Sequence, residues 1–336
     1  MSTKTTKPKR DRFQEATDRI IALMEDGNTP WRKPWDENKA GFNLPQNGGS
    51  KRPYRSINSA LLMCHPSFVE TGDPRFFTFN QIKENGWSLE KGTKGTKVYF
   101  FKKLELDNED PEAKEDKKVI PFLRDYPLWH ASQIKGCPEY TPRELKQQDW
   151  QKPLRVKATL DASGADIKIG GIRAYYQPSD DHIQLPPEQS FSNEEGWAST
   201  ALHELGHWTG HESRLDRQFG LKGDEAYARE ELRAELASVF LCGELGISPE
   251  LEQHASYLDN WLSVLKEDKH EIFRAASDAQ KISDFVMDYV PELKTGAELA
   301  EEADLPPHMR KEMGIEEGIS DECPFIVNQP VYGGPM

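Results

Sequence analysis

The feature that most constrains this 336-residue chain is a pair of histidines four residues apart, in the sequence HELGH at 203–207. The residues around it have the apolar spacing of an α-helix, on which positions i and i+4 lie on one face about 6 Å apart along the axis. His203 and His207 can therefore bind one metal ion, and the Glu204 carboxylate can reach a water at its open coordination position. Chance alone yields roughly 0.02 matches at this histidine content, so we predict a metal site on a helix over 193–209.

A catalytic metal site of this kind needs a third protein ligand. His211 lies eight residues after His203, which is about 12 Å along a continuous helix and too far for one ion. Gly210 can break the helix and let His211 fold back, but the metzincin spacing would place the third histidine at Ser213. We therefore expect His211 to lie beside the ligands or on the substrate side.

The predicted helix over residues 225–243 offers a better third ligand. Glu231 and Glu235 are four residues apart and share one face, and the apolar residues around them indicate a substantially buried helix. A carboxylate on a buried helix needs a partner, and a metal ion is one. We predict that Glu231 is the third ligand and that Glu235 orients a histidine by a hydrogen bond. Glu230 is the neighbour most easily confused with Glu231.

Together these residues predict a metallopeptidase. The expected cofactor is Zn2+, although the same donors also accept Mn2+ or Co2+. A bound ion would activate water and polarise the scissile carbonyl, while Glu204 takes the proton and delivers it to the leaving amine. The segment DHIQLP at 181–186 is expected to be an edge strand that pairs with an extended substrate peptide.

Charge is distributed unevenly along the chain. Residues 1–103 contain 19 Lys and Arg against 11 Asp and Glu, a net charge of +8, so the remaining residues contribute −22 to the overall −14. The basic residues are interleaved with aromatic ones, in PWRKPW at 30–35, RPYR at 52–55 and RFF at 75–77, and KGTKGTK follows at 91–97. Cations along phosphates and aromatic faces against bases are typical of single-stranded DNA binding.

No recognition helix for duplex DNA stands out, which favours single strands. We expect about half of the aromatic residues to be core residues instead. The predicted DNA-binding residues are Trp31, Arg32, Lys33, Trp35, Arg52, Tyr54, Arg55, Lys94 and Lys97.

The pattern of the chain predicts an α+β fold in two domains, each long enough to bury its own core. These are a basic α+β domain that binds single-stranded DNA over 1–140 and a mainly helical metallopeptidase domain with a small β-sheet over 150–290, followed by an acidic Pro/Gly-rich tail over 291–336. Helices are expected at 11–25, 54–64, 153–163, 193–209, 225–243, 249–266 and 269–288, with a short one capped by Thr78 or Asn80. Strands are expected at 97–101, 119–123, 165–170, 172–176 and 181–186, and an exposed, mobile loop at 104–118.

Cysteine usage and hydropathy bear on the compartment. No run of 18 apolar residues predicts a membrane span, and no apolar run of a secretory signal follows the basic N-terminus. Four scattered cysteines without a CxxC pair indicate free thiols in a reducing, cytoplasmic environment.

Several runs resemble the ArdC-type antirestriction proteins of conjugative plasmids, over about residues 11–290. They are FQEATDRIIALMEDGNTPWRKPW, KRPYRSIN, HELGHWTGHESRL and YAREELRAELASVFLCGELGI. The front of the chain also resembles TraC-type plasmid primases. The resemblance implies an N-terminal domain for single-stranded DNA and a C-terminal zincin-like domain of gluzincin type, in the cytoplasm of a bacterial donor or recipient cell. It further implies protection of incoming plasmid DNA from restriction during conjugation, with a site on His203, Glu204, His207 and a Glu of the EELRAE segment.

Three other functions stay open. The chain can be a non-catalytic protein that coats single-stranded DNA and has a structural metal site, although such a site has no use for Glu204. It can be an acidic DNA mimic that inhibits restriction enzymes, although a mimic gains nothing from a basic front. It can be a metal-dependent nuclease, although nucleases favour carboxylate-rich two-metal clusters. The sequence does not name the protein or peptide substrate, for which a host restriction component is one candidate.

Overall fold

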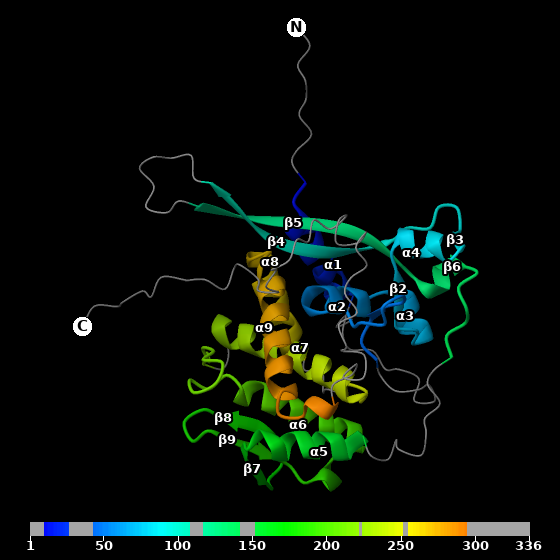
Figure 1. Ribbon diagram of the computed structural model, residues 1–336. Helices are drawn as coiled ribbons and strands as arrows, with labels where there is room; N and C mark the ends of the chain where they lie inside the picture. The colour runs from blue at the N-terminus through cyan, green and yellow to red at the C-terminus, as the bar shows by residue number, and fades with distance from the viewer. Residues whose placement is uncertain are drawn as a thin grey trace.

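The structure is a computed structural model, and it describes residues 10–26, 43–107, 117–141, 152–221, 224–250 and 255–293. Figure 1 shows a long two-stranded ribbon with short helices at one end, and long helices with a second small sheet at the other. We call residues 10–141 the front part and residues 152–293 the second part. The mixture of helices and sheets confirms the predicted α+β class.

The front part contains short elements apart from α1 and the β4–β5 ribbon. Its helices are α1 (Arg12–Glu25), α2 (Ser56–Met63), α3 (Pro66–Thr71) and α4 (Phe79–Glu84). Its strands are β1 (Gln46–Asn47), β2 (Arg75–Phe77), β3 (Ser88–Leu89), β4 (Thr96–Asp107), β5 (Lys117–His130) and β6 (Ile134–Lys135).

Local sequence explains where these helices begin. The Asp11 carboxylate accepts hydrogen bonds from the backbone N–H groups of Phe13 and Gln14, both at 3.1 Å, which starts α1. Thr78 and Gln81 form a reciprocal capping box at the start of α4. Of the two caps that the sequence offered for this short helix, Thr78 is therefore the right one.

The front sheet has the strand order β1-β2-β5-β4, and β4 and β5 form a long antiparallel hairpin. Their register runs from Thr96 opposite Leu128 to Asp107 opposite Lys117. The predicted loop over 104–118 was therefore too long at both ends. Leu104 and Leu106 alternate with acidic residues, which is the period of a strand. Residues 108–116 lie outside the described part of the chain.

The second part is mainly helical. Its helices are α5 (Lys152–Ser163), α6 (Glu194–Trp208), α7 (Glu225–Leu245), α8 (Ala255–Glu267) and α9 (Glu271–Met287). Its strands are β7 (Asp166–Ile169), β8 (Tyr175–Gln177) and β9 (His182–Leu185). Most lie where the sequence pattern predicted them, but β8 begins three residues later than the predicted strand over 172–176, and residues 249–250 of the helix predicted over 249–266 are not helical. Gly246 ends α7 in the left-handed conformation, with φ 73°.

The second sheet has the order β7-β9-β8. β9 pairs in parallel with β7 and antiparallel with β8, so it is the central strand. The prediction that residues 181–186 form an edge strand was therefore wrong, and β7 and β8 are the two edges instead. Alternation along a strand indicates which face is buried, but it carries no information on which neighbours pair with it.

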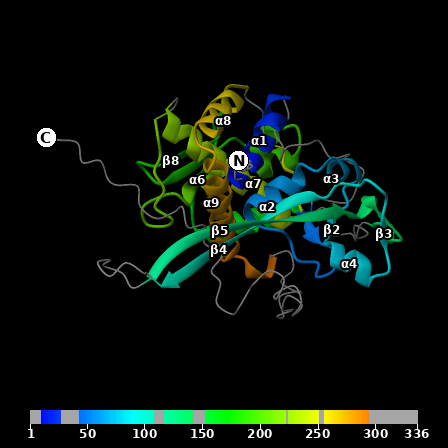
Figure 2. The same ribbon diagram turned by 90° about the horizontal axis from the view of Figure 1, so that it is seen from above.

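The main hydrophobic core extends through both parts, and a second, small cluster lies in the front part alone. Figure 2 shows α1 beside α8, and the β4–β5 ribbon passing over α2 and α9. At this junction the ring of Phe273 on α9 lies 4.9 Å from Phe13 of α1 and 5.9 Å from Tyr99 of β4. The Thr17 hydroxyl also donates to the backbone carbonyl of Lys269 at 2.7 Å. The front part is thus fixed directly to the helices behind the second sheet.

A buried ion-pair network ties α7 to α9. Glu271 of α9 is fully buried and contacts Arg229, Arg233 and Arg274, with Arg233 Nη1 2.8 Å from its Oε1. Arg233 also contacts Asp278 at 2.8 Å. The arginine donors offset the cost of burying the Glu271 carboxylate. Because Arg229 and Arg233 belong to α7 and Glu271 to α9, these contacts fix the rotation of one helix against the other.

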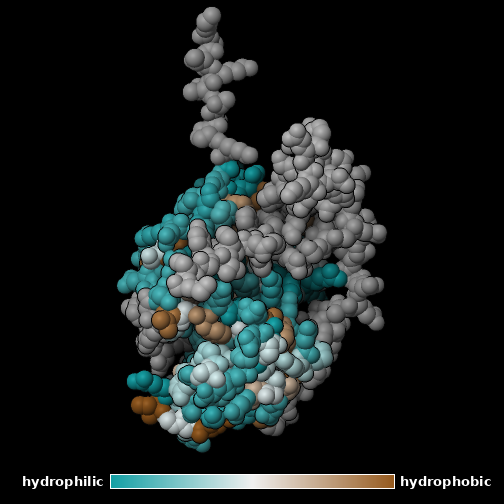
Figure 3. Space-filling view, turned by 90° about the vertical axis from the view of Figure 1, so that its left-hand side faces the viewer, coloured by the Kyte–Doolittle hydropathy of each residue, from teal (hydrophilic) through white to brown (hydrophobic). Residues whose placement is uncertain are grey.

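No helix in the described ranges is long and apolar enough to cross a membrane. The face in Figure 3 is predominantly hydrophilic, with a few small apolar patches. Cys64, Cys137 and Cys242 are free thiols. Residue 140 lies within the described part of the chain, whereas residue 150 and the predicted tail beyond residue 293 lie outside it.

Candidate metal centre

The residues of the site come from α6 and α7, which pack side by side. Asn193 caps α6 by accepting a hydrogen bond from the Gly196 N–H at 2.7 Å. Further along, a Cβ placed on Gly206 would lie 3.6 Å from the Cα of Ala234 on α7. Because both residues are small, the two helices approach closely, and the histidines of α6 face the glutamates of α7.

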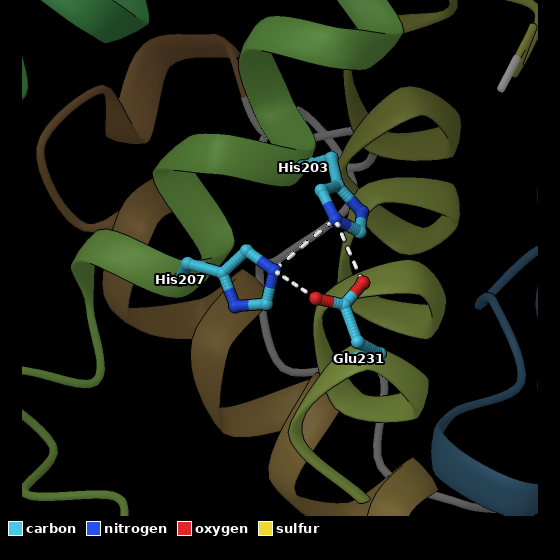
Figure 4. Close-up of side chains that lie close together, drawn as sticks. All are labelled: His203, His207 and Glu231. Carbon is cyan, nitrogen blue, oxygen red and sulfur yellow. Dashed lines mark hydrogen bonds and ion pairs between the residues drawn. The ribbon is translucent and has the colours of Figure 1, made fainter. Parts of the chain in front are cut away.

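The structure brings the predicted ligands His203, His207 and Glu231 together. The two Nε2 atoms lie 3.2 Å apart, and Glu231 oxygens lie 3.6 Å from His203 Nε2 and 3.5 Å from His207 Nε2 (Figure 4). Donor atoms about 2.0–2.1 Å from a tetrahedral ion lie roughly 3.3 Å from one another. The three donors therefore fit a divalent cation, and they form the one such group of three among the described residues.

Two further carboxylates of α7 approach the outer nitrogens of the histidine rings. Glu230 Oε1 lies 3.2 Å from His207 Nδ1, which donates to it. Glu235, the residue expected to orient a histidine, lies 3.7 Å from His203 Nδ1, which is longer than a hydrogen bond. Glu230 was thus missed as an orienting residue, although its position next to Glu231 was a signal for it.

The charges around His203 and His207 favour a bound cation. Burial disfavours a protonated His207, but Glu231 and Glu230 outweigh it and raise its pKa to about 10. Burial also opposes ionisation of Glu231, but His207 and His203 hold its pKa well below the usual range. Two carboxylates thus face these rings, and a bound divalent cation would replace the proton that His207 otherwise holds.

Glu204 is buried next to the three donors, with 7% of its surface exposed. Burial raises its pKa, and the charges of His203 and His207 oppose that rise. The backbone N–H of Tyr176 in β8 also lies near this carboxylate and lowers its pKa. The edge strand β8 therefore lies close to the residue predicted to be the base.

His211 does not join the donor group. α6 ends at Trp208, and the chain turns at Gly210, whose N–H donates to the His207 carbonyl at 2.8 Å. The His211 ring is half exposed and its Nδ1 lies 2.8 Å from the Ser213 hydroxyl. The residue that the turn does bring to the site is Arg217, which the sequence did not single out and which binds Glu230.

The predicted DNA-binding residues separate into three groups. Trp31, Arg32, Lys33 and Trp35 lie outside the described residues. Arg52 and Lys94 are exposed. The others make protein contacts: Tyr54 packs on the core, Arg55 pairs with Asp284, and Lys97 pairs with Glu15 at 3.1 Å.

The RFF segment does not offer a nucleic-acid surface. Phe76 and Phe77 are core residues, and Arg75 makes two hydrogen bonds to Asp73, at 2.8 and 2.9 Å. An exposed aromatic that the sequence reasoning missed lies close by: Phe79 is 56% exposed, and its ring centroid is 6.0 Å from that of Trp129. A position just after a helix cap, where side chains point to solvent, was the available signal.

Two different family models match the front part and the second part of the chain. The model of the N-terminal domain of anti-restriction factor ArdC matches residues 10–129, and that of a zincin-like metallopeptidase matches residues 154–278. A crystal structure of the antirestriction ArdC protein from the R388 plasmid, free of metal, has a TM-score of 0.69 and 39% identity, covering 85% of this chain and all of that one. Its Mn(II)-bound structure gives 0.67 and 38%, covering 83% and 98%.

Curated relatives point the same way. The chain is 40% identical to a DNA primase TraC of Escherichia coli and 38% to another, over 82% and 83% of its length. It spans only 27% and 20% of the length of these primases. It is also 33% identical to the uncharacterized protein y4eC of Sinorhizobium fredii (strain NBRC 101917 / NGR234), over 82% of this chain and 91% of that protein.

A helix carrying HELGH, packed against a helix that supplies a third donor, is the architecture of a zincin-like domain, and here it follows a domain of a different type. Similarity extends over both domains and over the whole of a solved relative. The chain belongs to the ArdC family of antirestriction proteins.

Proposed function

We propose that this chain protects incoming plasmid DNA from restriction during conjugation, and that it combines a metal-dependent peptidase site with a surface for single-stranded DNA. The observation that carries the peptidase proposal is the convergence of His203, His207 and Glu231 beside the buried Glu204. Zn2+ is the cation that these donors favour, and Mn2+ or Co2+ fit the same arrangement.

A divalent ion bound to these donors supplies Lewis-acid chemistry that activates water and polarises a peptide carbonyl. In this proposal Glu204 takes the proton from the attacking water and passes it to the leaving amine. The buried position of Glu204 suits this role, because burial raises the pKa of its carboxyl and so eases both uptake and release of the proton.

The substrate is proposed to be an extended segment of a protein, for which a host restriction component is one candidate. β8 is an edge strand, and such strands pair with extended peptides through backbone hydrogen bonds. Because β8 packs against α6 and the Tyr176 N–H lies near Glu204, a peptide along β8 would lie next to the proposed base. Strand β8 takes over the role that the sequence had suggested for residues 181–186.

Single-stranded DNA is the proposed ligand of the front part. Support comes from the +8 charge of residues 1–103 and from the exposed side chains of Arg52, Lys94 and Phe79. Phe79 and Trp129 offer an aromatic surface for bases, with Lys94 beside the Gly95 that contacts Trp129. Bacterial cytoplasm, in donor or recipient, is the proposed location.

The main alternative is a protein that coats DNA and whose metal only stabilises the fold. A Glu204→Gln variant separates the two functions, since it keeps the shape of the side chain and removes the base. We expect normal metal content, loss of casein hydrolysis by at least about 100-fold, and unchanged oligonucleotide binding. Wild-type protein that holds metal but never cleaves a protein substrate would contradict the peptidase proposal. Antirestriction by the variant would show that protection needs no cleavage.

A further inference from the structure

We propose that Arg217 is a positioning residue for the metal centre: it holds Glu230 so that this carboxylate fixes the ring of His207. This inference rests on the metal site proposed above. Arg217 is not a ligand and lies ten residues after His207, outside the motif, and it acts through Glu230.

The guanidinium of Arg217 binds both oxygens of Glu230. Its Nη2 lies 2.9 Å from Oε1 and its Nε lies 3.1 Å from Oε2, which is the forked geometry that only arginine supplies. Nη2 also donates to the Gly206 carbonyl at 2.7 Å, and Nη1 donates to the Thr209 hydroxyl at 2.8 Å. One side chain therefore joins the end of α6 to the carboxylate on α7.

The held carboxylate determines the state of the His207 ring. Glu230 Oε1 accepts the N–H of His207 Nδ1, so the neutral ring has its lone pair on Nε2, the atom that faces His203 and Glu231. Glu230 is only 3% exposed, and without Arg217 its charge would be left without its forked partner. His203 lacks such support, since its Nδ1 lies 3.7 Å from Glu235.

The chain after α6 folds back to deliver Arg217. The Leu215 N–H donates to the Thr209 carbonyl and the Arg217 N–H to the Gly210 carbonyl, both at 2.9 Å. A Cβ on Gly210 would lie 2.6 Å from the ring of Phe219 and 3.0 Å from an Arg217 nitrogen, so the turn leaves no room for a side chain there. The break that Gly210 allows thus serves Arg217 and not His211.

Arg214 provides a matched control in the same turn. Its guanidinium contacts Asp181 and donates to the Trp208 carbonyl at 2.7 Å, and it lies 3.8 Å from the centre of the Trp208 ring. These contacts are as extensive as those of Arg217, but none of them reaches Glu230 or a predicted ligand. Loss of Arg214 should therefore disturb the turn without releasing His207.

The test compares Arg217→Gln, Arg217→Lys and Arg214→Gln in the full chain. Zn2+ affinity is measured by competition with a chelator, the Co2+ absorption spectrum reports the ligand geometry, and metal-free melting temperature reports the fold. We expect Arg217→Gln to weaken Zn2+ binding by about 10- to 100-fold and to alter the Co2+ spectrum, since such partners of metal ligands contribute that much. Arg217→Lys should recover part of the affinity, and Arg214→Gln should stay near wild type.

The double variant Arg217→Gln/Glu230→Gln gives a second criterion. If Arg217 acts through Glu230, the double variant binds Zn2+ no more weakly than the worse single variant, whereas independent effects would multiply. If Arg217→Gln does not fold, the Arg217→Lys variant is used instead, because it keeps the positive charge but cannot bind both oxygens of Glu230. Unchanged Zn2+ affinity in the Arg217 variants, or a double variant whose loss is the product of the two single losses, would overturn the role of Arg217 but leave the metal site in place. Absence of Zn2+ binding by the wild type would overturn the metal site as well.

Discussion

Glu230 and Glu231 are consecutive residues of α7, and both contact the ring of His207, at opposite nitrogens. Glu230 Oε1 lies 3.2 Å from Nδ1, and Glu231 Oε1 lies 3.5 Å from Nε2. Adjacent residues on a helix usually point about 100° apart, so they reach the same ring only because it lies between them. One carboxylate is thus available to a metal ion and the other to the N–H behind it.

This arrangement predicts different effects for three glutamates of α7. Glu231→Gln should weaken Zn2+ binding most, because it replaces a charged ligand, and Glu230→Gln should weaken it by about 10- to 100-fold. Glu235→Gln should have the smallest effect, since its oxygen is beyond hydrogen-bond distance from His203. Chelator competition on the three variants measures the order. Equal losses would mean that Glu231 is not the distinguishing ligand.

The exposed aromatic of the front part predicts a base-stacking contact. Phe79→Ala should weaken binding of a single-stranded oligonucleotide by roughly 5- to 150-fold, since stacking on one base contributes about 1–3 kcal/mol. The matched control is Tyr289→Ala, which removes a 38% exposed aromatic from the second part. Fluorescence anisotropy at two salt concentrations measures both affinity and charge dependence. A Phe79 variant that binds like the control would remove this surface from the proposal.

Lys94 is predicted to contact phosphate. A Lys94→Gln variant should bind oligonucleotides more weakly at low salt and show a salt slope reduced by about 0.7, the value for one phosphate contact on a single strand. Lys157, which pairs with Glu188 in the second part at 2.7 Å, gives the control substitution. If the Lys157 variant loses more oligonucleotide affinity than the Lys94 variant, the DNA binds the second part of the molecule, which would contradict this proposal.

A buried histidine predicts acid-sensitive folding. Burial, with the charges of His130 and Arg19, lowers the pKa of His65 to about 4. Below pH 6.5 the His65 ring therefore binds a proton in the unfolded chain but not in the folded one. The free energy of unfolding thus decreases as the pH falls from about 6.5 towards 4. Between pH 7 and 5 this group should contribute about 2 kcal/mol of loss.

The variant His65→Asn tests this assignment. The His65 Nδ1 accepts a hydrogen bond from the Ser67 N–H at 3.2 Å, and asparagine can take over this cap without titrating. Urea unfolding of wild type and variant at pH 7 and pH 5 gives the two differences. A variant that loses as much stability on acidification as the wild type would show that other groups are responsible.

The buried ion network predicts a large stability effect from one carboxylate. Glu271→Gln should destabilise the fold by about 3–5 kcal/mol, because Arg229, Arg233 and Arg274 lose their common partner. In contrast, Asp284→Asn removes an exposed pair with Arg55 and should cost at most about 1 kcal/mol. Denaturant unfolding compares the two. Similar losses would mean that the network is not the main link between α7 and α9.

Local elements were predictable because their signals are local. The capped amphipathic helix α1, the HELGH helix α6 and the strands β7 and β9 lie where residue spacing predicted them. The length of the β4–β5 hairpin and the order of the second sheet did not follow from spacing. Both depend on which strands pair, and pairing is decided by contacts between residues distant in the sequence.

The candidate site was predictable to the same extent. One helical turn relates His203 to His207, and burial of a carboxylate indicates Glu231, so these residues followed from the chain alone. Arg217 did not, because nothing in its sequence neighbourhood indicates that a turn at Gly210 returns it to Glu230. Tyr54 likewise has arginine neighbours in the sequence that are typical of a DNA-binding site, and only the tertiary structure shows that its ring packs against the core.

The sequence by itself determined the helix that presents the two histidines, the carboxylate between them and the charge difference between the two parts, because each depends on spacing or composition along the chain. Tertiary structure decided which of three glutamates on α7 faces which ring nitrogen, which strands of the second sheet are its edges, and that the main core extends through both parts. Those outcomes depend on how helices and strands pack against each other, and close packing selects among arrangements that the sequence pattern leaves equivalent.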